Sequence, residues 1–457
     1  MQNYAVAAVE LLYQYLAPSA VRIGKDATDL LLATSGGNVE QEPAEHPRFF
    51  DGFLQKPEQT AVALLGCARV ARTRYYMPPG MVAGILIAAD PVVTSEAAGL
   101  RFESFSLCCG VYARLDVLSD GLDRPPAAIG TTNVDFNPPM REALARIAQS
   151  QPVRLYVGAD EVGIKTWGGQ VVEQKVPLSQ RWIRGFGEVQ VATSQLELLS
   201  DISIADARVF LRSLPRSSRH LSWAHPAGKS LRLSSLPGPG AVCLAGPERL
   251  RALEPLLRFA RTMRVYGRDA GKYDGPSASA WQLVLDGAHF TVVVSPEVSR
   301  GFSGEGGLLF GLATTEADLD AGKLIPLLGW GRPIDIPRLA ASAAMSRERT
   351  RTALMILAAQ GRVGYDLDQG AYFHRELPLK ADALVKMNPR LLDAKELVAE
   401  GKVHLEGEGA RVESGDLEHR VTFATDGDSC TCPWWGKYAG TRGPCKHVLA
   451  ARLAADG

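Results

Sequence analysis

This sequence of 457 residues has no long apolar run and no net charge. Its richest early apolar stretch, Met81 to Ala89, is too short to cross a bilayer, and no basic segment followed by an apolar one opens the chain. We therefore expect neither export nor membrane insertion, and the expected compartment is the cytoplasm. Fifty basic residues balance fifty acidic ones, so any contact with a nucleic acid must depend on a local patch.

The common catalytic motifs are also missing. Gly301 to Gly307 is rich in glycine, but it lacks the Gly-Lys-Ser/Thr ending of a nucleotide-binding P-loop. Asp201-Ile202-Ser203 begins like a metal-dependent adhesion motif, yet Ala205 stands where the second serine is needed. Neither the His-Glu-x-x-His zinc motif nor the Gly-x-Ser-x-Gly nucleophile motif occurs. These absences favour a protein without enzymatic activity.

The composition is that of a folded protein, with 46% hydrophobic and 22% charged residues. Because a single core seldom extends over such a length, we expect several domains. We predict a multidomain α+β protein with a β-rich middle region, a winged-helix-like module and a C-terminal region that contains Cys430, Cys432, Cys445 and His447 in two close pairs. The predicted domains are an N-terminal α+β domain over residues 1–150, a β-rich domain over 151–325, the winged-helix-like module over 326–385 and this C-terminal region, termed the finger region, over 386–457.

Local patterns predict several elements of the first two domains. A helix is expected from Pro57 to about Arg72, because proline suits the first helical turn and apolar residues recur behind it. Cys108 to Leu115 reads as a strand. Trp281 to Leu285 and His289 to Val294 flank Asp286-Gly287, a dipeptide that tolerates the positive φ angles of a tight turn, so they predict a β-hairpin.

The winged-helix prediction depends on the order of elements after residue 333. Two helices, Ile336 to Ala343 and Arg347 to Gln360, precede two short strands, with Ser346 as the expected N-cap of the second helix. That helix carries Arg347, Arg349 and Arg351, which would contact phosphates if it entered a DNA groove. Winged helices also dock proteins, and an arginine-rich helix face is often merely solvated, so both readings stay open.

A metal centre is predicted near the C-terminus. Cys430 and Cys432 form a C-x-C pair, and Cys445 and His447 form a C-x-H pair after a gap of twelve residues. Three thiolates and one imidazole suit the tetrahedral coordination of zinc. Because protein ligands would fill all four positions, we expect one structural zinc ion and no catalytic metal. Pro444 and the apolar stretch after His447 predict a helix that starts at Cys445, where free backbone N–H groups favour a thiolate.

These four ligands and their spacing resemble the SWIM-type zinc finger, whose pattern is C-x-C, a variable gap and C-x-H. The resemblance covers about the last fifty residues, and it implies zinc binding together with contact to DNA or to another protein. The stretches Arg101 to Asp116 and Gly130 to Asn137 look like parts of bacterial SWIM-finger proteins found beside MoxR-type AAA+ ATPases and von Willebrand A-domain proteins. That likeness implies work within an ATPase-linked assembly, with such proteins as partners.

The gap between the two ligand pairs is aromatic and basic. Trp434, Trp435, Lys437, Tyr438 and Arg442 could stack on bases and neutralise phosphates. Packing around the metal is the other explanation, since a small zinc module has little core of its own. The two roles are compatible.

Two further features have both a functional and a structural reading. The adjacent Cys108 and Cys109 would face opposite sides of a strand, which favours packing over a shared metal or a reactive thiol. Asp135 lies in the expected polar turn Gly130 to Asn137 and could belong to an acid/base or metal site, although side-chain caps explain such a turn as well.

Two functional hypotheses follow from the sequence. The first is a non-enzymatic zinc-binding adaptor whose winged helix and finger contact DNA or a protein partner. The second is an enzyme whose active site lies within residues 1–310 and whose finger brings it to a substrate. Perturbed acidic groups that converge with Asp135 in a cleft would support the second hypothesis.

Overall fold

The computed structural model describes residues 12–15, 17–39, 42–76, 90–158, 174–177, 180–218, 220–272, 275–304, 306, 309, 315–330, 333–377, 389–424, 427–440 and 442–455. The apolar stretch Met81 to Ala89 lies outside these residues. Both helices and sheets are present, which confirms the mixed composition of the fold. Among the described helices, none is both long and apolar enough to span a lipid bilayer.

The chain forms two compact units, and each contains segments that are distant in the sequence. Unit 1 comprises residues 1–182, 195–301 and 375–379. Unit 2 comprises residues 183–194, 302–374 and 380–457. The helix α4 (Gln180–Thr193) therefore contributes to both units. The predicted winged-helix-like module and finger region both lie mainly in unit 2.

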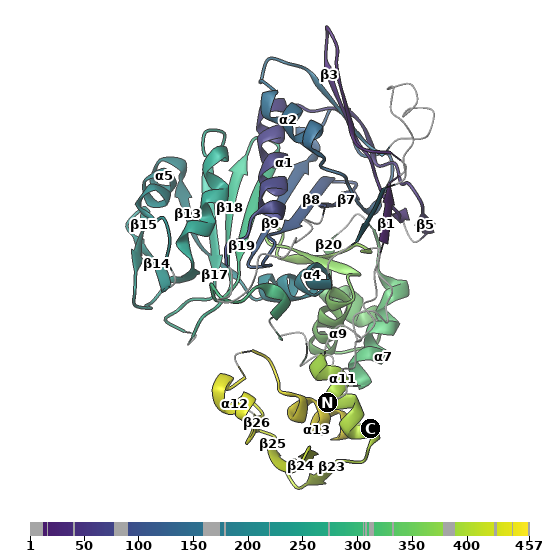
Figure 1. Ribbon diagram of the computed structural model, residues 1–457, viewed down its shortest axis with the longest axis vertical. Helices are drawn as coiled ribbons and strands as arrows, with labels where there is room; N and C mark the ends of the chain where they lie inside the picture. The colour runs from purple at the N-terminus through teal and green to yellow at the C-terminus, as the bar shows by residue number, and fades with distance from the viewer. Residues whose placement is uncertain are drawn as a thin grey trace. The chain divides into compact units, whose positions relative to one another are not determined.

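Unit 1 is built on a ten-stranded antiparallel sheet with the strand order β13-β17-β18-β19-β9-β8-β7-β10-β4-β5 (Figure 1). Its strands are β4 (Gly37–Val39), β5 (Glu42–Ala44), β7 (Val92–Glu96), β8 (Gly99–Phe105), β9 (Val111–Leu118), β10 (Gly130–Asn133), β13 (Glu197–Ser203), β17 (Thr262–Gly267), β18 (Ser279–Leu285) and β19 (Ala288–Val294).

Three smaller sheets complete unit 1. The first has the order β2-β3-β11-β6, the second β15-β14-β16, and the third pairs β1 with β12. These strands are β1 (Leu12–Tyr15), β2 (Ala20–Ile23), β3 (Thr28–Leu32), β6 (Phe50–Phe53), β11 (Val153–Val157), β12 (Gln174–Pro177), β14 (Leu221–Ala227), β15 (Ser230–Ser234) and β16 (Val242–Ala245). The unit's helices are α1 (Pro57–Arg72), α2 (Pro138–Arg146), α5 (Ile204–Ser213) and the 3-10 helices η1 (Ser119–Gly121) and η2 (Pro247–Leu256).

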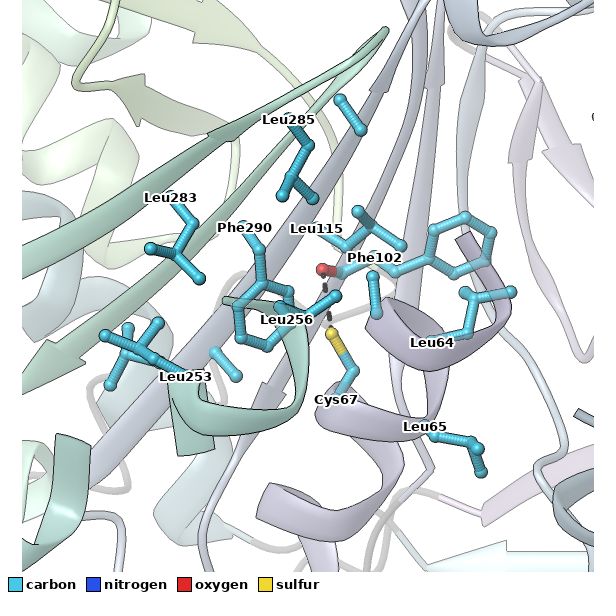
Figure 2. Close-up of a cluster of buried hydrophobic side chains, with 14 of the residues drawn as sticks. Leu64, Leu65, Cys67, Phe102, Leu115, Leu253, Leu256, Leu283, Leu285 and Phe290 are labelled. Atoms are coloured by element: carbon cyan, nitrogen blue, oxygen red, sulfur yellow. Dashed lines mark hydrogen bonds between the residues drawn. The ribbon is translucent and has the colours of Figure 1, made fainter. Parts of the chain in front are cut away.

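The core of unit 1 lies between α1 and the large sheet. Leucine, phenylalanine and cysteine side chains from α1, β8, β9, β18, β19 and η2 interlock there (Figure 2). Gly66 of α1 lets the helix approach the sheet, because a β-carbon at this position would lie 2.8 Å from the Phe290 ring. The predicted helix from Pro57 to Arg72 is confirmed, with proline in its first turn.

The predicted hairpin is also confirmed. Strands β18 and β19 pair in register from Ser279–Val294 to Leu285–Ala288, and Gly287 adopts a φ of 66° in the turn. The expected strand from Cys108, however, begins only at Val111. Residues before it form a turn in which Cys109 has a φ of 54°, so the alternation of faces expected of Cys108 and Cys109 does not apply.

The boundary predicted at residue 150 falls inside unit 1. Strand β11 comes after that position, yet it pairs with β3 and β6, which both come before it. Strand β19 likewise pairs along its whole length with β9. The hydrogen bonds of these sheets thus connect the N-terminal segment, up to residue 150, to the segment that follows it.

Unit 2 contains a helical part and the finger. The helical part has α7 (Thr315–Leu324), the 3-10 helix η4 (Ile325–Leu327), α8 (Ile336–Ser342) and α9 (Arg347–Ala359), with a three-stranded sheet β20-β22-β21 made of β20 (Pro333–Ile334), β21 (Val363–Asp366) and β22 (Ala371–His374). Ser346 caps α9 as expected, since its hydroxyl accepts from the backbone N–H of Arg349.

The finger region follows the helix α11 (Pro389–Ala399). It consists of a four-stranded sheet, β23 (Val403–Glu406), β24 (Gly409–Ser414), β25 (Leu417–Thr422) and β26 (Ser429–Cys430), and of the helices α12 (Pro433–Tyr438) and α13 (Lys446–Ala455). Figure 1 colours this part yellow at the C-terminal end of the chain. The apolar side of α13, including Val448 and Leu449, shares one core with Val412 and Val421 of the sheet.

Candidate metal centre

The four predicted ligands lie together in the finger. Cys430 ends β26, where it pairs with Val421, and His447 is in the first turn of α13. One ligand atom from each of Cys430, Cys432, Cys445 and His447 lies within 4.8 Å of all the others, and the four residues are buried. The sequence spacing therefore brings its ligands to one point.

Two of the thiols act as caps at the start of helices. The Sγ atom of Cys432 accepts from the backbone N–H of Trp435 at 3.4 Å, and Sγ of Cys445 accepts from that of Val448 at 3.4 Å. Proline follows Cys432 and precedes Cys445, so the chain enters and leaves the gap in defined conformations. Backbone N–H groups at a helix start favour a sulfur that carries negative charge, as zinc requires.

The size of the cluster fits zinc. For bonds of about 2.3 Å to sulfur, the edges of a tetrahedron measure about 3.8 Å. The Sγ atom of Cys430 lies 3.8 Å from Nδ1 of His447. In the described part of the chain, the buried Nε2 atom of His447 has no hydrogen-bond partner. Three sulfurs and an imidazole at these separations form a donor set that suits zinc, with no ligand position left for water.

The three thiols of the cluster differ in pKa. Hydrogen bonding from Cys430, supported by His447 and the backbone N–H of Val448, lowers the pKa of Cys445 to about 4. The same hydrogen bond, together with burial, raises the pKa of Cys430. Burial also raises the pKa of Cys432. Of the three thiols, Cys445 is the one that its surroundings most favour as a thiolate, and zinc binding would require the loss of the protons of all three.

Side chains from neighbouring elements pack beside the four ligands and hold their elements together. The ring of His419 on β25 lies 4.3 Å from the ring of His447. Asp428 accepts from Arg452 of α13 at 2.8 Å and so joins the approach to β26 to the final helix. Arg452 in turn lies 4.2 Å over the Phe423 ring. These contacts fix the sheet and α13 against each other, and with them Cys430 and His447.

The aromatic and basic residues of the gap divide into two groups. Trp434 is half-buried, and its ring centre lies 4.8 Å from the guanidinium of Arg390 and 5.2 Å from that of Arg442. Trp435 is also half-buried and packs on the same core. Lys437 is exposed and lies 5.2 Å from the Tyr438 ring. The tryptophans thus pack in the finger, whereas Lys437 is directed to the surface.

Arg390 supports the gap and was not predicted from the sequence. Its Nη1 atom donates to the carbonyl oxygens of Arg442 at 2.8 Å and Pro444 at 2.9 Å. This side chain comes from α11, which precedes the whole sheet of the finger. Its only sequence signal is its place directly after Pro389, which marks a helix start and not a contact.

The three arginines of α9 differ in their surroundings. Arg349 donates twice to the carboxylate of Asp320 on α7, at 2.8 Å from both Nε and Nη2. Arg347 and Arg351 are exposed and stand one helical turn apart. The predicted basic face is therefore formed by these two residues, while Arg349 joins two helices of unit 2.

Asp135 raises the pKa of a second acid, Asp90. Burial and the charge of Asp135 raise the pKa of Asp90 to about 7, and burial raises the pKa of Asp135 itself. The Asp135 carboxylate accepts from the backbone N–H of Ser19 at 2.8 Å and from Asn137 at 3.0 Å. These bonds tie β10 to the N-terminal segment, so Asp135 has a structural role in the fold.

A comparison with known protein families gives one match, which lies in the finger region. The family model of the SWIM zinc finger matches residues 419–456, the segment that holds the four ligands. This part of the chain is thus similar to SWIM-type zinc fingers, and zinc is the metal that the match and the Cys/His cluster suggest. The match covers a small part of the chain and describes that part only.

The other comparisons add little. A search among curated proteins found no match. Among solved structures, the chain is similar to the crystal structure of proliferating cellular nuclear antigen from Entamoeba histolytica, with 8% sequence identity and a TM-score of 0.30. The similarity covers 55% of this chain and 98% of that one. At this score it carries no argument about function.

Proposed function

We propose that the protein is a non-enzymatic adaptor that holds one structural zinc ion and uses unit 2 to contact a macromolecule, with DNA as the favoured ligand. The observation that supports this most is the charge of the finger. From Ser429 to Ala455 the sequence has four basic residues and no acidic one. In a chain without net charge, this segment is a local basic patch.

Not all of that charge is available to a ligand. Lys446 pairs with Asp393 at 3.8 Å, and Arg452 is bonded to Asp428. Lys437 and Arg442 remain, and both lie against the Tyr438 ring. An ammonium and a guanidinium beside a half-buried aromatic ring suit a phosphate backbone with adjacent bases. The tryptophans would keep this loop in shape.

The helical part of unit 2 supports the same proposal. Its element order, α7, η4, β20, α8, α9, β21 and β22, is compatible with the proposed winged helix, in which α9 would be the recognition helix. Arg347 and Arg351 on α9 would then contact phosphates on one side of the groove. Glu348 stands between them in the sequence and reduces the positive charge of this face of α9. We therefore expect α9 to add to the DNA affinity of the protein without supplying most of it.

Zinc would serve the structure of the finger. Four protein ligands leave no position at which the metal could activate water. The ion would hold β26, α12 and α13 together at a place where the apolar core is small. We further propose that the protein works in the cytoplasm, where cysteines stay reduced and available to the metal.

The experiment is a titration of zinc-loaded protein with duplex DNA across salt concentrations. Phosphate contacts predict an affinity that falls steeply and linearly on a log–log plot, with a slope of about −0.9 per contact. Replacing Lys437 and Arg351 by alanine should reduce that slope by about two units. Arg251→Ala, which removes an exposed arginine of unit 1, is the matched control. Absence of salt-dependent binding would instead favour a protein partner.

The partners implied by the sequence resemblance are a separate proposal. MoxR-type AAA+ ATPases and von Willebrand A-domain proteins would be the protein partners if the adaptor belongs to an ATPase-linked assembly. Co-purification of the wild-type protein with such an ATPase, compared with a Cys432→Ser variant, tests it. Recovery of neither protein with the wild type would contradict this part of the proposal.

An enzyme with its site within residues 1–310 is the second candidate. The observation in its favour is the pair of buried acids, Asp90 and Asp135, with Tyr15 donating to Asp90 at 3.1 Å. The bonds from Ser19 and Asn137 give the pair a structural explanation, which is why we rank this candidate second. If the wild-type protein has a hydrolytic activity and folded Asp90→Asn protein lacks it, the enzyme becomes the better candidate.

A further inference from the structure

The small sheet β15-β14-β16 of unit 1 lies in a stretch of the chain without acidic residues. Residues 207–247 contain six lysines and arginines and no aspartate or glutamate, whereas the whole chain has fifty basic and fifty acidic residues. All three strands of the sheet fall within this stretch. Because a local excess of positive charge attracts anions even in a chain without net charge, the surface of this sheet is suited to a polyanion.

The two faces of this sheet differ in their residues. On one face, Ala224 of β14 and Leu231 of β15 are buried in the core of unit 1. The register places His225 of β14 directly opposite Arg232 of β15, and Trp223 precedes His225 by two residues. Since successive side chains of a strand point to opposite faces, these three residues share the face that is turned away from the core.

The Trp223 side chain on this outer face is only partly covered by the protein. It is half-buried and does not belong to the core of unit 1. Trp182 and Trp281 of the same unit are buried, and their rings pack against those of Phe105 and Phe210. Among the described residues, no aromatic ring or guanidinium contacts the Trp223 indole in this way. An indole left accessible on a sheet face can stack on a nucleic-acid base.

Two positive charges at the same sheet are available to a ligand. Arg232 lies on β15, and Lys229 lies in the turn just before that strand. Both side chains are exposed, and neither forms an ion pair within the described part of the chain. Arg258, which is also exposed, is instead paired with Glu58 at 2.6 Å. Cations without a carboxylate partner can neutralise phosphates without first breaking an ion pair.

His225 holds the loop that follows β15 beside this face. Its Nε2 atom donates to the carbonyl oxygen of Leu236 at 2.8 Å. Leu236 itself is 70% exposed, so the loop adds an accessible apolar side chain to the rim of the sheet. The face therefore combines an accessible indole and an apolar rim with two unpaired cations, which are the groups that contact bases and phosphates.

We propose that this outer face, with Trp223, Lys229 and Arg232 as its contact residues, binds single-stranded DNA. The indole stacks on a base while Lys229 and Arg232 neutralise phosphates of the same strand. A duplex keeps the faces of its bases stacked inside the helix, so the indole favours a single strand. The choice of DNA rests on the proposed function of unit 2, whereas the contact itself needs neither the finger nor α9.

The first experiment is a titration of zinc-loaded, full-length protein with a fluorescent oligothymidylate across salt concentrations. Each phosphate contact to a single strand contributes about −0.7 to the log–log slope, so replacing both Lys229 and Arg232 by alanine should reduce the slope by about 1.4 units. Trp223→Leu should weaken binding about fivefold or more. Arg251→Ala, on the helix η2 that packs into the core of unit 1, is the matched control and should change neither value. An unchanged slope in the double variant, or wild-type affinity in Trp223→Leu protein, would overturn the proposal.

The second experiment locates the contact on the protein. Ultraviolet light crosslinks oligothymidylate to the side chains that it touches, and peptide mass spectrometry identifies them. Crosslinks are expected within residues 221–234, both in wild-type protein and in protein in which Lys437 and Arg351 are replaced by alanine. Crosslinks confined to the finger would contradict this inference and leave the proposed DNA contact of unit 2 standing. Equally tight binding of polyglutamate, unaffected by Trp223→Leu, would indicate an acidic protein partner and would also contradict it.

Discussion

The guanidinium of Arg390 lies 4.8 Å from the centre of the Trp434 ring, and the same group donates to the carbonyl oxygens just before Cys445. One side chain of α11 therefore supports both the aromatic part of the gap and the start of α13. We expect zinc binding to depend on this support more than the exposed contact residues do. Zinc release and DNA affinity measure the two effects separately.

Trp434→Ala should weaken the finger. The change removes a half-buried ring that contacts two guanidinium groups, at an expected cost of about 1–3 kcal/mol. The rate of zinc release to a chelator is the measurement, and it should rise. Lys437→Ala is the matched control, because Lys437 is exposed, and it should leave zinc release unchanged while lowering DNA affinity. Equal effects on zinc release would contradict the division between packing and contact residues.

Arg349→Ala should destabilise unit 2 in a pH-dependent way. The bonds from Arg349 lower the pKa of Asp320, so the folded state binds this proton more weakly than the unfolded state. The resulting stability is fully present above the ordinary carboxyl value of about 4 and is lost as the pH falls through the lower folded value. Because Arg349 is partly exposed and Lys323 also pairs with Asp320, denaturation at pH 7 should show a loss of about 1 kcal/mol, and Arg347→Ala should show almost none. A similar loss in both variants would contradict this account.

Asp90 should have the opposite effect in unit 1. Its pKa is raised from 3.8 to about 7, first by burial and then by Asp135, so the folded state binds the proton more strongly than the unfolded state. Stability should therefore fall as the pH rises from about 4 to about 7, by at most about 1.4 kcal/mol per pH unit. Asp90→Asn should remove that slope. A wild-type protein whose unit 1 is equally stable at pH 5 and pH 7 would contradict the assignment.

Features that depend on a few neighbouring residues were predictable from the sequence. Pro57 and Ser346 mark the starts of their helices, and Asp286-Gly287 marks its turn, because each acts on the backbone beside it. The zinc ligands belong to the same group. Two closely spaced pairs carry their own chemistry, so the metal could be inferred before the sheet that brings them together was known.

Long-range pairing was not predictable in the same way. Strands β9 and β19 are both largely apolar and lie far apart in the sequence, and nothing in either segment specifies the other as its neighbour. The domain boundary expected at residue 150 separates these two strands, which the sheet joins. The reading of Cys108 as part of a strand failed for a related reason, since the turn is held by Ser106 and by Gly301 from a distant segment. Arg390 likewise gains its role only through contacts between elements.

The central claim is that Cys430, Cys432, Cys445 and His447 hold one zinc ion that maintains the finger. The most direct test is the metal content of the purified full-length protein, with X-ray absorption at the zinc edge to count its ligands. The account predicts one zinc per chain bound by three sulfurs and one nitrogen, lost in Cys432→Ser protein and retained in Cys243→Ser protein. Wild-type protein that contains no zinc, or a Cys432→Ser variant that retains it with the same ligands, would contradict the account.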